Sequence, residues 1–216
     1  MTGVKDILKK NKIFFFCYAV ILIAGITFLL IKGKRESFLI LNSSHSSAAD
    51  TFFIVFTYLG DGLFAVALSL FYFFVLKKRR EGLTFLVAYA LTGIVAQVIK
   101  SFVFSPRPLV YFHPEVFSFF IDGIIHGGNR SFPSGHTATA FAIATIFAYY
   151  TNSAWKYFLL LFLASLVGFS RVYLSQHFLL DVLAGSVLGI LGGALCLNWC
   201  SRLDERKLTP WVKNKL

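Results

Sequence analysis

The sequence is poor in charge and especially in acidic side chains. Charged residues make up 14% of the 216 residues, and 21 basic residues outnumber 10 acidic ones to give a net charge of +11. Such a charge would suit a nucleic-acid-binding protein, but the basic residues cluster at the ends of apolar segments and form no stripe on a soluble face. Nucleic acid is therefore not expected as a partner.

Cysteine is also scarce, with Cys17, Cys196 and Cys200 as its only occurrences. All three fall inside apolar runs, they lack metal-ligand spacing, and the polar loops hold no cysteine that could pair with them. This pattern excludes both a disulfide framework and a cysteine-based metal site. The three side chains are expected to be small buried hydrophobes.

Apolar residues are what the sequence has in excess. Hydrophobic side chains account for 57% of the chain and aromatic ones for 18%, whereas an average soluble protein is about 45 to 50% apolar. The composition predicts an integral membrane protein. The length suits a single domain that covers residues 1–216.

Six apolar segments predict an all-α membrane protein with six transmembrane helices. Their lengths bracket the roughly 20 residues that cross a hydrocarbon core. No small-residue cleavage site follows the first segment, which is therefore expected to be a retained span and not a signal peptide. The predicted spans cover residues 13–31, 51–76, 83–99, 137–150, 155–169 and 182–197.

The distribution of lysine and arginine predicts the orientation. With six spans both termini lie on one side, and that side receives most of the basic residues, including the run "KKRR" at 77–80. Because cytoplasmic loops carry an excess of lysine and arginine, both termini are predicted to be cytoplasmic. The compact chain has no organelle-type targeting extension, so we expect a bacterial cytoplasmic membrane.

The first motif, "KSFVFSPRP", follows the third predicted span. That span is long enough to carry Lys100 to the far interface. Pro106 and Pro108 keep the chain around Arg107 out of a regular helix and direct the arginine back toward the membrane. Taken alone, the motif favours a snorkelling lysine and a headgroup-binding arginine.

The second motif, "FPSGHTATA", opens the fourth predicted span. Pro133 ends any preceding helix, Ser134 is a good N-cap, and Gly135 and His136 fall in the first turn. Unpaired N–H groups and the positive end of the helix dipole favour an anion there, so His136 would stand over a phosphate cradle. Taken alone, the motif is an ordinary capped helix start with an interfacial histidine.

The third motif, "SRVYLSQHFLLD", lies between the fifth and sixth predicted spans. Ionisable residues near lipid are costly and indicate a function with a named partner. If His177 and Asp181 lie on one helix, their spacing puts the carboxylate one turn from the imidazole. It would accept the imidazole N–H, fix the tautomer and leave the other nitrogen as a nucleophile. The alternative is a salt-bridged pair at an interface.

All three motifs fall on the same predicted face. Convergent cations, a helix N-terminus, two histidines and one orienting carboxylate are what phosphoryl transfer requires. At these residues the chain resembles the type 2 phosphatidic acid phosphatase superfamily, integral membrane lipid phosphatases that share a site with soluble vanadium haloperoxidases. The resemblance covers the motif region 100–181 and is carried by Lys100 with Arg107-Pro108, Pro133-Ser134-Gly135-His136, and Ser170-Arg171 with His177 and Asp181.

The resemblance implies a role for each matching residue. His177 would attack phosphorus to form a phosphohistidine while Asp181 holds it, and His136 would protonate the departing oxygen and then activate water. A bell-shaped rate profile follows, because His177 must be neutral and His136 protonated. No metal or cofactor is implied, since cations and helix N–H groups take the place of a metal ion. The residues that would bind the phosphoryl oxygens are Lys100, Arg107, Ser134, Gly135 and Arg171.

The sequence therefore predicts a hydrolase that releases phosphate from a membrane lipid at the extracytoplasmic face. Phosphatidate, phosphatidylglycerol phosphate and phosphorylated lipid A are candidate substrates, and an undecaprenyl diphosphate phosphatase is the alternative. Substrate identity is expected to reside in the aromatic and glycine-rich loop of residues 100–136. The oligomeric state is not indicated.

Proteins of other classes fit less well. A non-catalytic phospholipid-binding protein would have no need of two histidines with an aspartate. A transporter is expected to have a midplane site and inverted repeats, and neither is visible in the sequence. The related haloperoxidases are soluble, which disfavours that activity.

Several further polar and small residues invite interpretation. His45, His113 and His126 are expected to be solvated loop histidines. Asp61 lies within the second predicted span and either faces the site or interrupts the helix. A small-residue face, which lets helices approach closely, is predicted on the sixth span at Gly185, Gly189 and Gly193.

Overall fold

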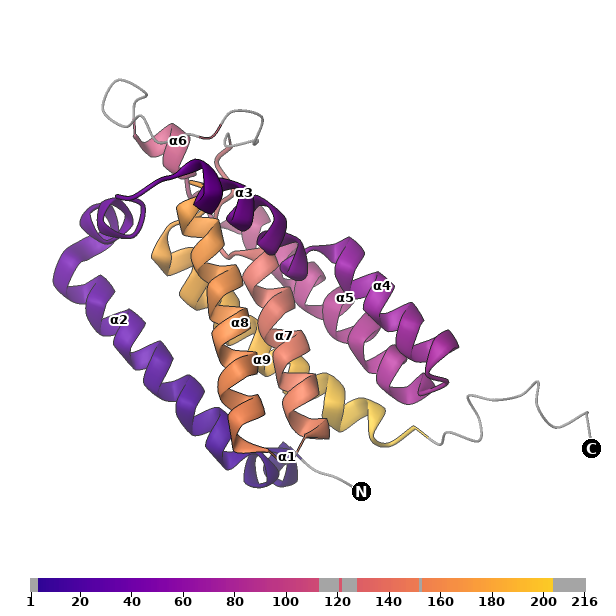
Figure 1. The fold of residues 1–216 in the computed structure, drawn as a ribbon. Coiled ribbons are helices and arrows are strands. Elements are labelled where there is room, and N and C mark those ends of the chain that lie inside the picture. Colours follow the sequence, from indigo (N-terminus) through magenta and orange to yellow (C-terminus); the bar gives the residue numbers. More distant parts are fainter. Residues whose placement is uncertain (1–3, 113–120, 122–127, 152, 204–216) are drawn as a thin grey trace, which may run out of the picture.

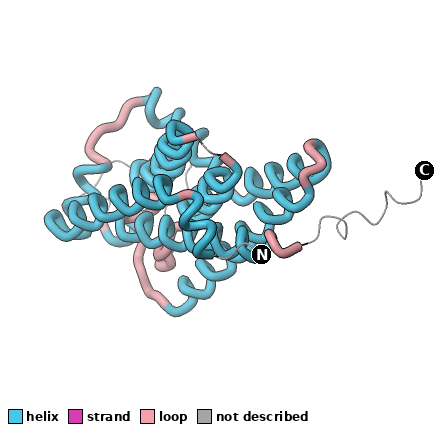
Figure 2. Tube along the Cα trace, turned by 90° about the horizontal axis from the view of Figure 1, so that it is seen from below, coloured by secondary structure: helices cyan, strands magenta, loops and turns pink. Residues whose placement is uncertain are grey.

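The computed structural model describes residues 4–112, 121, 128–151 and 153–203. Regular structure in this part of the chain is helical, apart from an isolated β-bridge between Ser105 and Arg130. The long helices run side by side as a bundle, and the loops lie at its two ends (Figure 1 and Figure 2). The predicted all-α architecture is confirmed.

Most of the helices are long, and several are interrupted. The longest, α2, has a non-helical residue, Gly33, whose φ of 72° suits glycine. In chain order the elements are α1 (Val4–Lys10), α2 (Lys12–Leu41), α3 (Ser47–Phe56), the 3₁₀ turn η1 (Thr57–Gly60), α4 (Gly62–Leu70), the π-helical turn η2 (Phe71–Val75), α5 (Arg79–Phe102), α6 (Pro108–Tyr111), α7 (Gly135–Tyr150), α8 (Ala154–Tyr173) and α9 (Leu179–Cys200).

The six predicted spans are supported in part by the lengths of the described helices. Four of the described helices, α2, α5, α8 and α9, are long and apolar enough to cross a membrane, and the bent pair α3–α4 would make a fifth. The remaining predicted span is α7, which has only 16 residues. Because α7 is enclosed by α5, α8 and α9, it needs neither the length nor the bulky apolar surface of a lipid-facing helix. The protein is an integral membrane protein, and its described residues include four or five candidate spans of this length and composition.

The second predicted span is not one continuous helix. Segments Ser47–Gly60 and Gly62–Val75 meet at an angle of 54°. Asp61 at the break is extended, with φ −78° and ψ 153°, and its Oδ1 accepts the N–H of Leu63 at 2.8 Å. The aspartate therefore caps α4 where the preceding helix ends. The sequence left open whether Asp61 interrupts the helix, and the structure shows that it does.

Small residues allow α9 to pack directly on α7, as predicted. A Cβ atom on Gly185 would lie 2.5 Å from the carbonyl oxygen of Ser134, and one on Gly193 would lie 2.9 Å from the Cβ of Thr145. Neither contact is tolerable, so these positions require glycine. The glycine face thereby holds the start of α9 against the start of α7.

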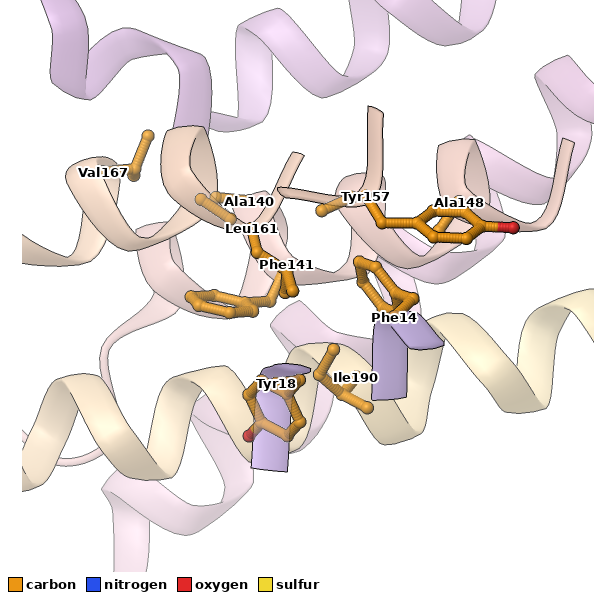
Figure 3. Packing of buried hydrophobic residues seen from close by; sticks show 11 residues of the cluster. Phe14, Tyr18, Ala140, Phe141, Ala148, Tyr157, Leu161, Val167 and Ile190 are labelled. Atoms are coloured by element: carbon orange, nitrogen blue, oxygen red, sulfur yellow. The ribbon is translucent and has the colours of Figure 1, made fainter. Parts of the chain in front are cut away.

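An aromatic and aliphatic core joins α2 to the central helices. Phe14 and Tyr18 of α2 point toward Phe141 of α7, Tyr157 of α8 and Ile190 of α9 (Figure 3). The ring centroids of Tyr18 and Phe141 are 5.7 Å apart in an edge-to-face arrangement. This packing makes α2 part of the bundle.

Candidate active site

The three sequence motifs meet at one end of the bundle. The end of α5, the segment before α6, the start of α7, the end of α8 and the start of α9 all lie there, with α3 beside them (Figure 1). Residues 113–120 and 122–127 of the predicted substrate loop lie outside the described residues, and these include His113 and His126. The site is therefore described from the motif residues at the helix ends and the residues that contact them.

Short backbone pairing draws the first and second motifs together. The N–H of Ser105 donates to the carbonyl of Asn129 at 3.1 Å, and the N–H of Ser131 donates to the carbonyl of Ser105 at 2.9 Å. The N–H of Arg107 also donates to the carbonyl of Gly128, at 3.0 Å. These bonds bring Arg107 next to the segment that leads into α7.

Arg107 is held by the loop that follows α8. Its backbone is extended, and Pro108 occupies the first position of α6, as the two prolines predict. One guanidinium nitrogen, Nη1, donates to Oε1 of Gln176 at 2.6 Å. Burial lowers the pKa of Arg107 and nearby Asp181 raises it, but the guanidinium remains a cation at physiological pH.

Arg171 lies in the last turn of α8 and is buried, with only 8% of the residue exposed. Its Nη1 donates to Oγ1 of Thr57 in η1 at 2.8 Å. Its Nε is buried and has no hydrogen-bond partner among the described residues. An unpaired buried donor costs about 1–3 kcal/mol, and more when charged, so this N–H is suited to a bound anion.

A third cation, Lys100, stands half-buried in the last turn of α5. Lys100, Arg107 and Arg171 lie close enough to repel one another electrostatically. Three like charges in a partly buried space give an electropositive site that attracts anions. Nowhere in the described residues do three His, Cys, Asp or Glu side chains gather as metal ligands.

The turn before α7 presents backbone N–H groups to this site. Ser134 is the N-cap, as predicted, and its Oγ accepts the N–H of Thr137 at 3.4 Å and the hydroxyl of Thr137 at 2.8 Å. The hydroxyl hydrogen of Ser134 is not used in these bonds. A Cβ on Gly135 would meet nothing within 4 Å, so this position faces open space. The first turn of α7 can thus accept an anion.

His177 and Asp181 are paired, but not across one helical turn as predicted. His177 lies in the loop before α9, and Asp181 is the third residue of that helix. The carboxylate folds back on its own N-terminus, where Oδ2 accepts the N–H of Phe178 at 2.9 Å and lies 3.4 Å from Nδ1 of His177. This bond from the N-cap N–H to the third helical residue, which is one half of a capping box, places the carboxylate beside the imidazole.

Ser131 lies between this histidine and this aspartate, although sequence reasoning missed it. Its hydroxyl donates to Oδ2 of Asp181, and its Oγ is 3.1 Å from Nδ1 of His177. A hydroxyl has one hydrogen, so Ser131 accepts the Nδ1–H of His177. The tautomer that results leaves Nε2 unprotonated.

Burial also keeps His177 uncharged. The residue is only 2% exposed, and its burial lowers the pKa of the imidazole to about 4, although hydrogen bonding to Asp181 works in the opposite direction. Arg171 and Arg107 depress this pKa further by charge repulsion. His177 is therefore neutral at physiological pH and carries an available lone pair.

The second histidine has a carboxylate of its own. Nε2 of His136 lies 3.6 Å from Oδ2 of Asp61, and both side chains are 30% exposed. Asp61 therefore does face the site as well as break the helix. The described part of the site thus contains two His–Asp pairs, His136 with Asp61 and His177 with Asp181.

Ser170 and His45 both have interaction partners outside the site. The Ser170 hydroxyl donates to the carbonyl of Val167 within its own helix at 2.6 Å, so it is engaged away from the site. His45 is not the solvated histidine that we predicted. Its ring lies 4.2 Å from that of Tyr173, and its Nδ1 is 3.0 Å from Asp50, because the loop between α2 and α3 folds over the end of α8.

The sequence did not predict the polar residues that contact the motif side chains, namely Thr57, Asp61, Gln176 and Ser131. Thr57 and Asp61 are four residues apart in an otherwise apolar segment, and this was an indication that could have found them. Gln176 immediately precedes His177, and Ser131 lies two residues before Pro133. Nothing in the spacing of these two residues indicated which side chains they would contact.

Comparison with known proteins agrees with the geometry. The family model of the PAP2 superfamily matches residues 81–205. The lipid A 4'-phosphatase of Porphyromonas gingivalis is 26% identical over 175 residues, which cover 76% of this chain and 71% of that protein. Undecaprenyl-diphosphatase BcrC of Bacillus subtilis is 31% identical over 165 residues, with coverages of 74% and 80%. The shared region spans 57% of phosphatidylglycerophosphatase B of Bacillus subtilis and 19% of the lipid A 1-phosphatase of Porphyromonas gingivalis.

A solved structure also matches. The crystal structure of Aquifex aeolicus LpxE is 33% identical and superimposes with a TM-score of 0.65, covering 76% of this chain and 94% of that one. The predicted class of protein, a membrane lipid phosphatase, is confirmed by these relatives. The three motifs, the helical membrane fold and the matched region of residues 81–205 together show that this chain belongs to the PAP2 superfamily.

Proposed function

We propose that this protein releases phosphate from a membrane lipid phosphate through a phosphohistidine formed on His177, without a metal ion. One observation carries the proposal. The buried Arg171 has an Nε–H with no hydrogen-bond partner among the described residues, and it lies within a cluster of three cations. Close to it is a neutral histidine whose Nδ1 is already engaged. An electrophile bound as an anion beside a positioned nucleophile is what phosphoryl transfer needs.

In the first step the free Nε2 of His177 attacks phosphorus. Lys100, Arg107 and Arg171 bind the equatorial oxygens, helped by the Ser134 hydroxyl and the Gly135 N–H. The P–O bond to the lipid breaks as the P–N bond forms. His136 gives its proton to the departing lipid oxygen.

In the second step a water molecule replaces the lipid. The now neutral His136 takes a proton from that water as its oxygen attacks phosphorus, and the P–N bond breaks. Inorganic phosphate leaves, His177 is free again and His136 is protonated for the next turnover. Atoms and protons balance over the cycle.

The substrate is proposed to be a lipid monoester such as phosphatidate, phosphatidylglycerol phosphate or phosphorylated lipid A. The relationship to the lipid A 4'-phosphatase supports this choice. The relationship to undecaprenyl-diphosphatase BcrC supports the alternative, in which the scissile bond lies within a diphosphate. The cation cluster binds a phosphoryl group in either case.

The proposed topology has six crossings, made by α2, the bent α3–α4 segment, α5, α7, α8 and α9. Both termini then lie in the cytoplasm, and the site opens at the outer face of a bacterial cytoplasmic membrane. The basic residues near α1, at 77–80 and after α9 support this orientation. All of residues 1–216 would form one phosphatase domain.

The test is phosphate release by purified protein in detergent containing EDTA, with a panel of lipid monophosphates and undecaprenyl diphosphate as substrates. His177→Ala is compared with His45→Ala, a matched control that removes a histidine outside the site. We expect release by the parent protein and by His45→Ala, with a loss of at least about 10³-fold in His177→Ala.

The panel also ranks the alternatives. The lipid that is hydrolysed fastest identifies the substrate class. If the parent protein releases nothing from any lipid, or if His177→Ala matches it, the catalytic proposal fails and a phospholipid-binding role takes its place. If EDTA abolishes release and an added metal restores it, the metal-independent mechanism fails.

A further inference from the structure

We propose that Asp61 is a positioning residue for His136, so that the site works with two His–Asp pairs and the break in the second predicted span exists to supply one of them. This inference rests on the proposed function, because it assigns Asp61 a part in the proton transfers of His136. None of the three sequence motifs contains Asp61.

The broken helix is shaped to deliver its polar residues to the site. Thr57 in η1 accepts a hydrogen bond from Arg171, and Asp61, four residues later, faces His136. Gly60 lies so close to α7 that a Cβ there would be 2.6 Å from the carbonyl oxygen of His136. The 54° bend and this close approach hold the carboxylate against the first turn of α7.

Asp61 also performs a structural task, which must be separated from the proposed one. Its Oδ1 caps α4 by accepting the N–H of Leu63 at 2.8 Å, whereas its Oδ2 is the atom nearest His136. Each oxygen thus has its own neighbour. A substitution that retains one acceptor oxygen and removes the charge preserves the first task and loses the second.

The charges around His136 explain why it needs a carboxylate. Burial of the ring opposes a positive charge on it, and Arg171 from α8, Lys100 from α5 and Arg107 from the segment before α6 add charge repulsion. His177 from the loop before α9 also faces it but is uncharged at physiological pH. Yet His136 must carry a proton to protonate the leaving oxygen. Asp61 supplies a negative charge on the side formed by η1 and α4.

The proton path follows from this arrangement. When His136 takes a proton from the attacking water, its new positive charge lies against the Asp61 side chain, whose Oδ2 is 3.6 Å from Nε2 of His136. In the next turnover the same proton passes to the departing lipid oxygen. Asp61 thus acts through His136 and makes no contact with the reacting phosphorus.

The experiment compares the pH dependence of phosphate release by the parent protein, Asp61→Asn and Asp50→Asn. Asparagine is as good an N-cap as aspartate, so Asp61→Asn should keep α4 intact. Asp50→Asn is the matched control, since Asp50 is paired with His45 at 3.0 Å on α3, outside the site. A lipid monophosphate from the panel serves as substrate.

For Asp61→Asn we expect kcat at pH 7.5 to fall at least about 10-fold with little change in KM. Removal of the carboxylate makes His136 lose its proton more easily, so the alkaline limb of the kcat profile should move about one pH unit lower. The loss should therefore be smaller at pH 6 than at pH 8. Asp50→Asn should retain the parent profile.

Other outcomes overturn the inference without affecting the proposed function. If Asp61→Asn keeps the parent pH profile while His177→Ala is inactive, the phosphatase mechanism stands and Asp61 only caps a helix. If Asp61→Asn does not fold, Asp61→Ser provides the test, because serine also caps helices and carries no charge. An unshifted profile in Asp61→Ser likewise refutes the role for Asp61.

Discussion

Single residues decide how the two histidines differ. His177 is enclosed, its Nδ1 contacts Ser131 and Asp181, and burial keeps it neutral. His136 is 30% exposed and lies beside Asp61 without a hydrogen bond. A neutral buried imidazole suits a nucleophile, and an accessible one beside a carboxylate suits a group that gains and loses protons.

The Ser131 hydroxyl offers the first prediction at this scale. In Ser131→Ala the Nδ1–H of His177 loses its acceptor and Asp181 loses a donor, so the imidazole should be less well oriented. We expect kcat to fall about 10-fold and KM to change little, because Lys100, Arg107 and Arg171, the cations proposed to bind phosphate, are untouched. Steady-state kinetics measures both, and Ser43→Ala, at an exposed position, is the control. Unchanged kcat would mean that Asp181 orients His177 without Ser131.

The pKa of His177 gives the second prediction. An ordinary histidine would become protonated below about pH 6.5 and stop attacking, but burial lowers the pKa of His177 to about 4. A depressed pKa moves the loss of nucleophile to lower pH, so the acid limb of kcat/KM should lie near pH 4 to 5. The measurement is phosphate release from pH 3.5 to 9 in detergent. An acid limb near pH 6.5 would show that His177 is more hydrated than its burial indicates.

At the scale of elements, the contact between α7 and α9 aligns the two halves of the site. The glycine face of α9 rests on the backbone of α7, and the N–H of Ser134 donates to the carbonyl of Asp181 at 2.9 Å. The first turn of α7 and the His177–Asp181 pair are thus joined by backbone contacts. A small displacement of α9 should therefore affect catalysis as well as stability.

Gly185→Ala tests this coupling. The added Cβ would lie 2.5 Å from the Ser134 carbonyl oxygen, so one of the two helices must move. We expect a loss of about 1–3 kcal/mol in stability, seen as a lower midpoint of thermal unfolding in detergent, together with reduced phosphate release. The control is Gly93→Ala in α5, where a Cβ meets nothing within 4 Å and should not lower the midpoint. Full activity in Gly185→Ala would show that the site tolerates the movement.

At the scale of the whole molecule, the proposed topology places the site at one surface of the bilayer. The motif end of the bundle and the end with α1 and the last turn of α9 lie opposite each other (Figure 1). A lipid phosphate has its headgroup at the bilayer surface. On this topology the proposed lipid substrate would reach the cation cluster from the leaflet on the motif side.

Cysteine labelling in whole cells tests the orientation. In a background without Cys17, Cys196 and Cys200, we expect Ser44→Cys in the loop before α3 to react with a membrane-impermeant maleimide. Ala154→Cys at the start of α8, on the opposite end, should react only after permeabilisation. The reverse pattern would place the site in the cytoplasm and contradict the proposed topology.

The sequence by itself determined the membrane class, the helical fold, the phosphatase motifs and the side chains that lie at the site. It could do so because apolar runs need helices in lipid, and because the motif residues lie at helix ends, where local spacing sets their position. Ser134 as the N-cap and the glycine face of α9 follow from the same local rules.

Only the tertiary structure decided what holds those side chains. Ser131 reaches His177 across 46 residues and Thr57 reaches Arg171 across 114, and no local rule predicts such contacts. The break at Asp61 was ambiguous for the same reason, since an aspartate caps or interrupts a helix depending on what packs against it. Close packing of distant helices, and not local propensity, sets which polar groups meet in a buried site.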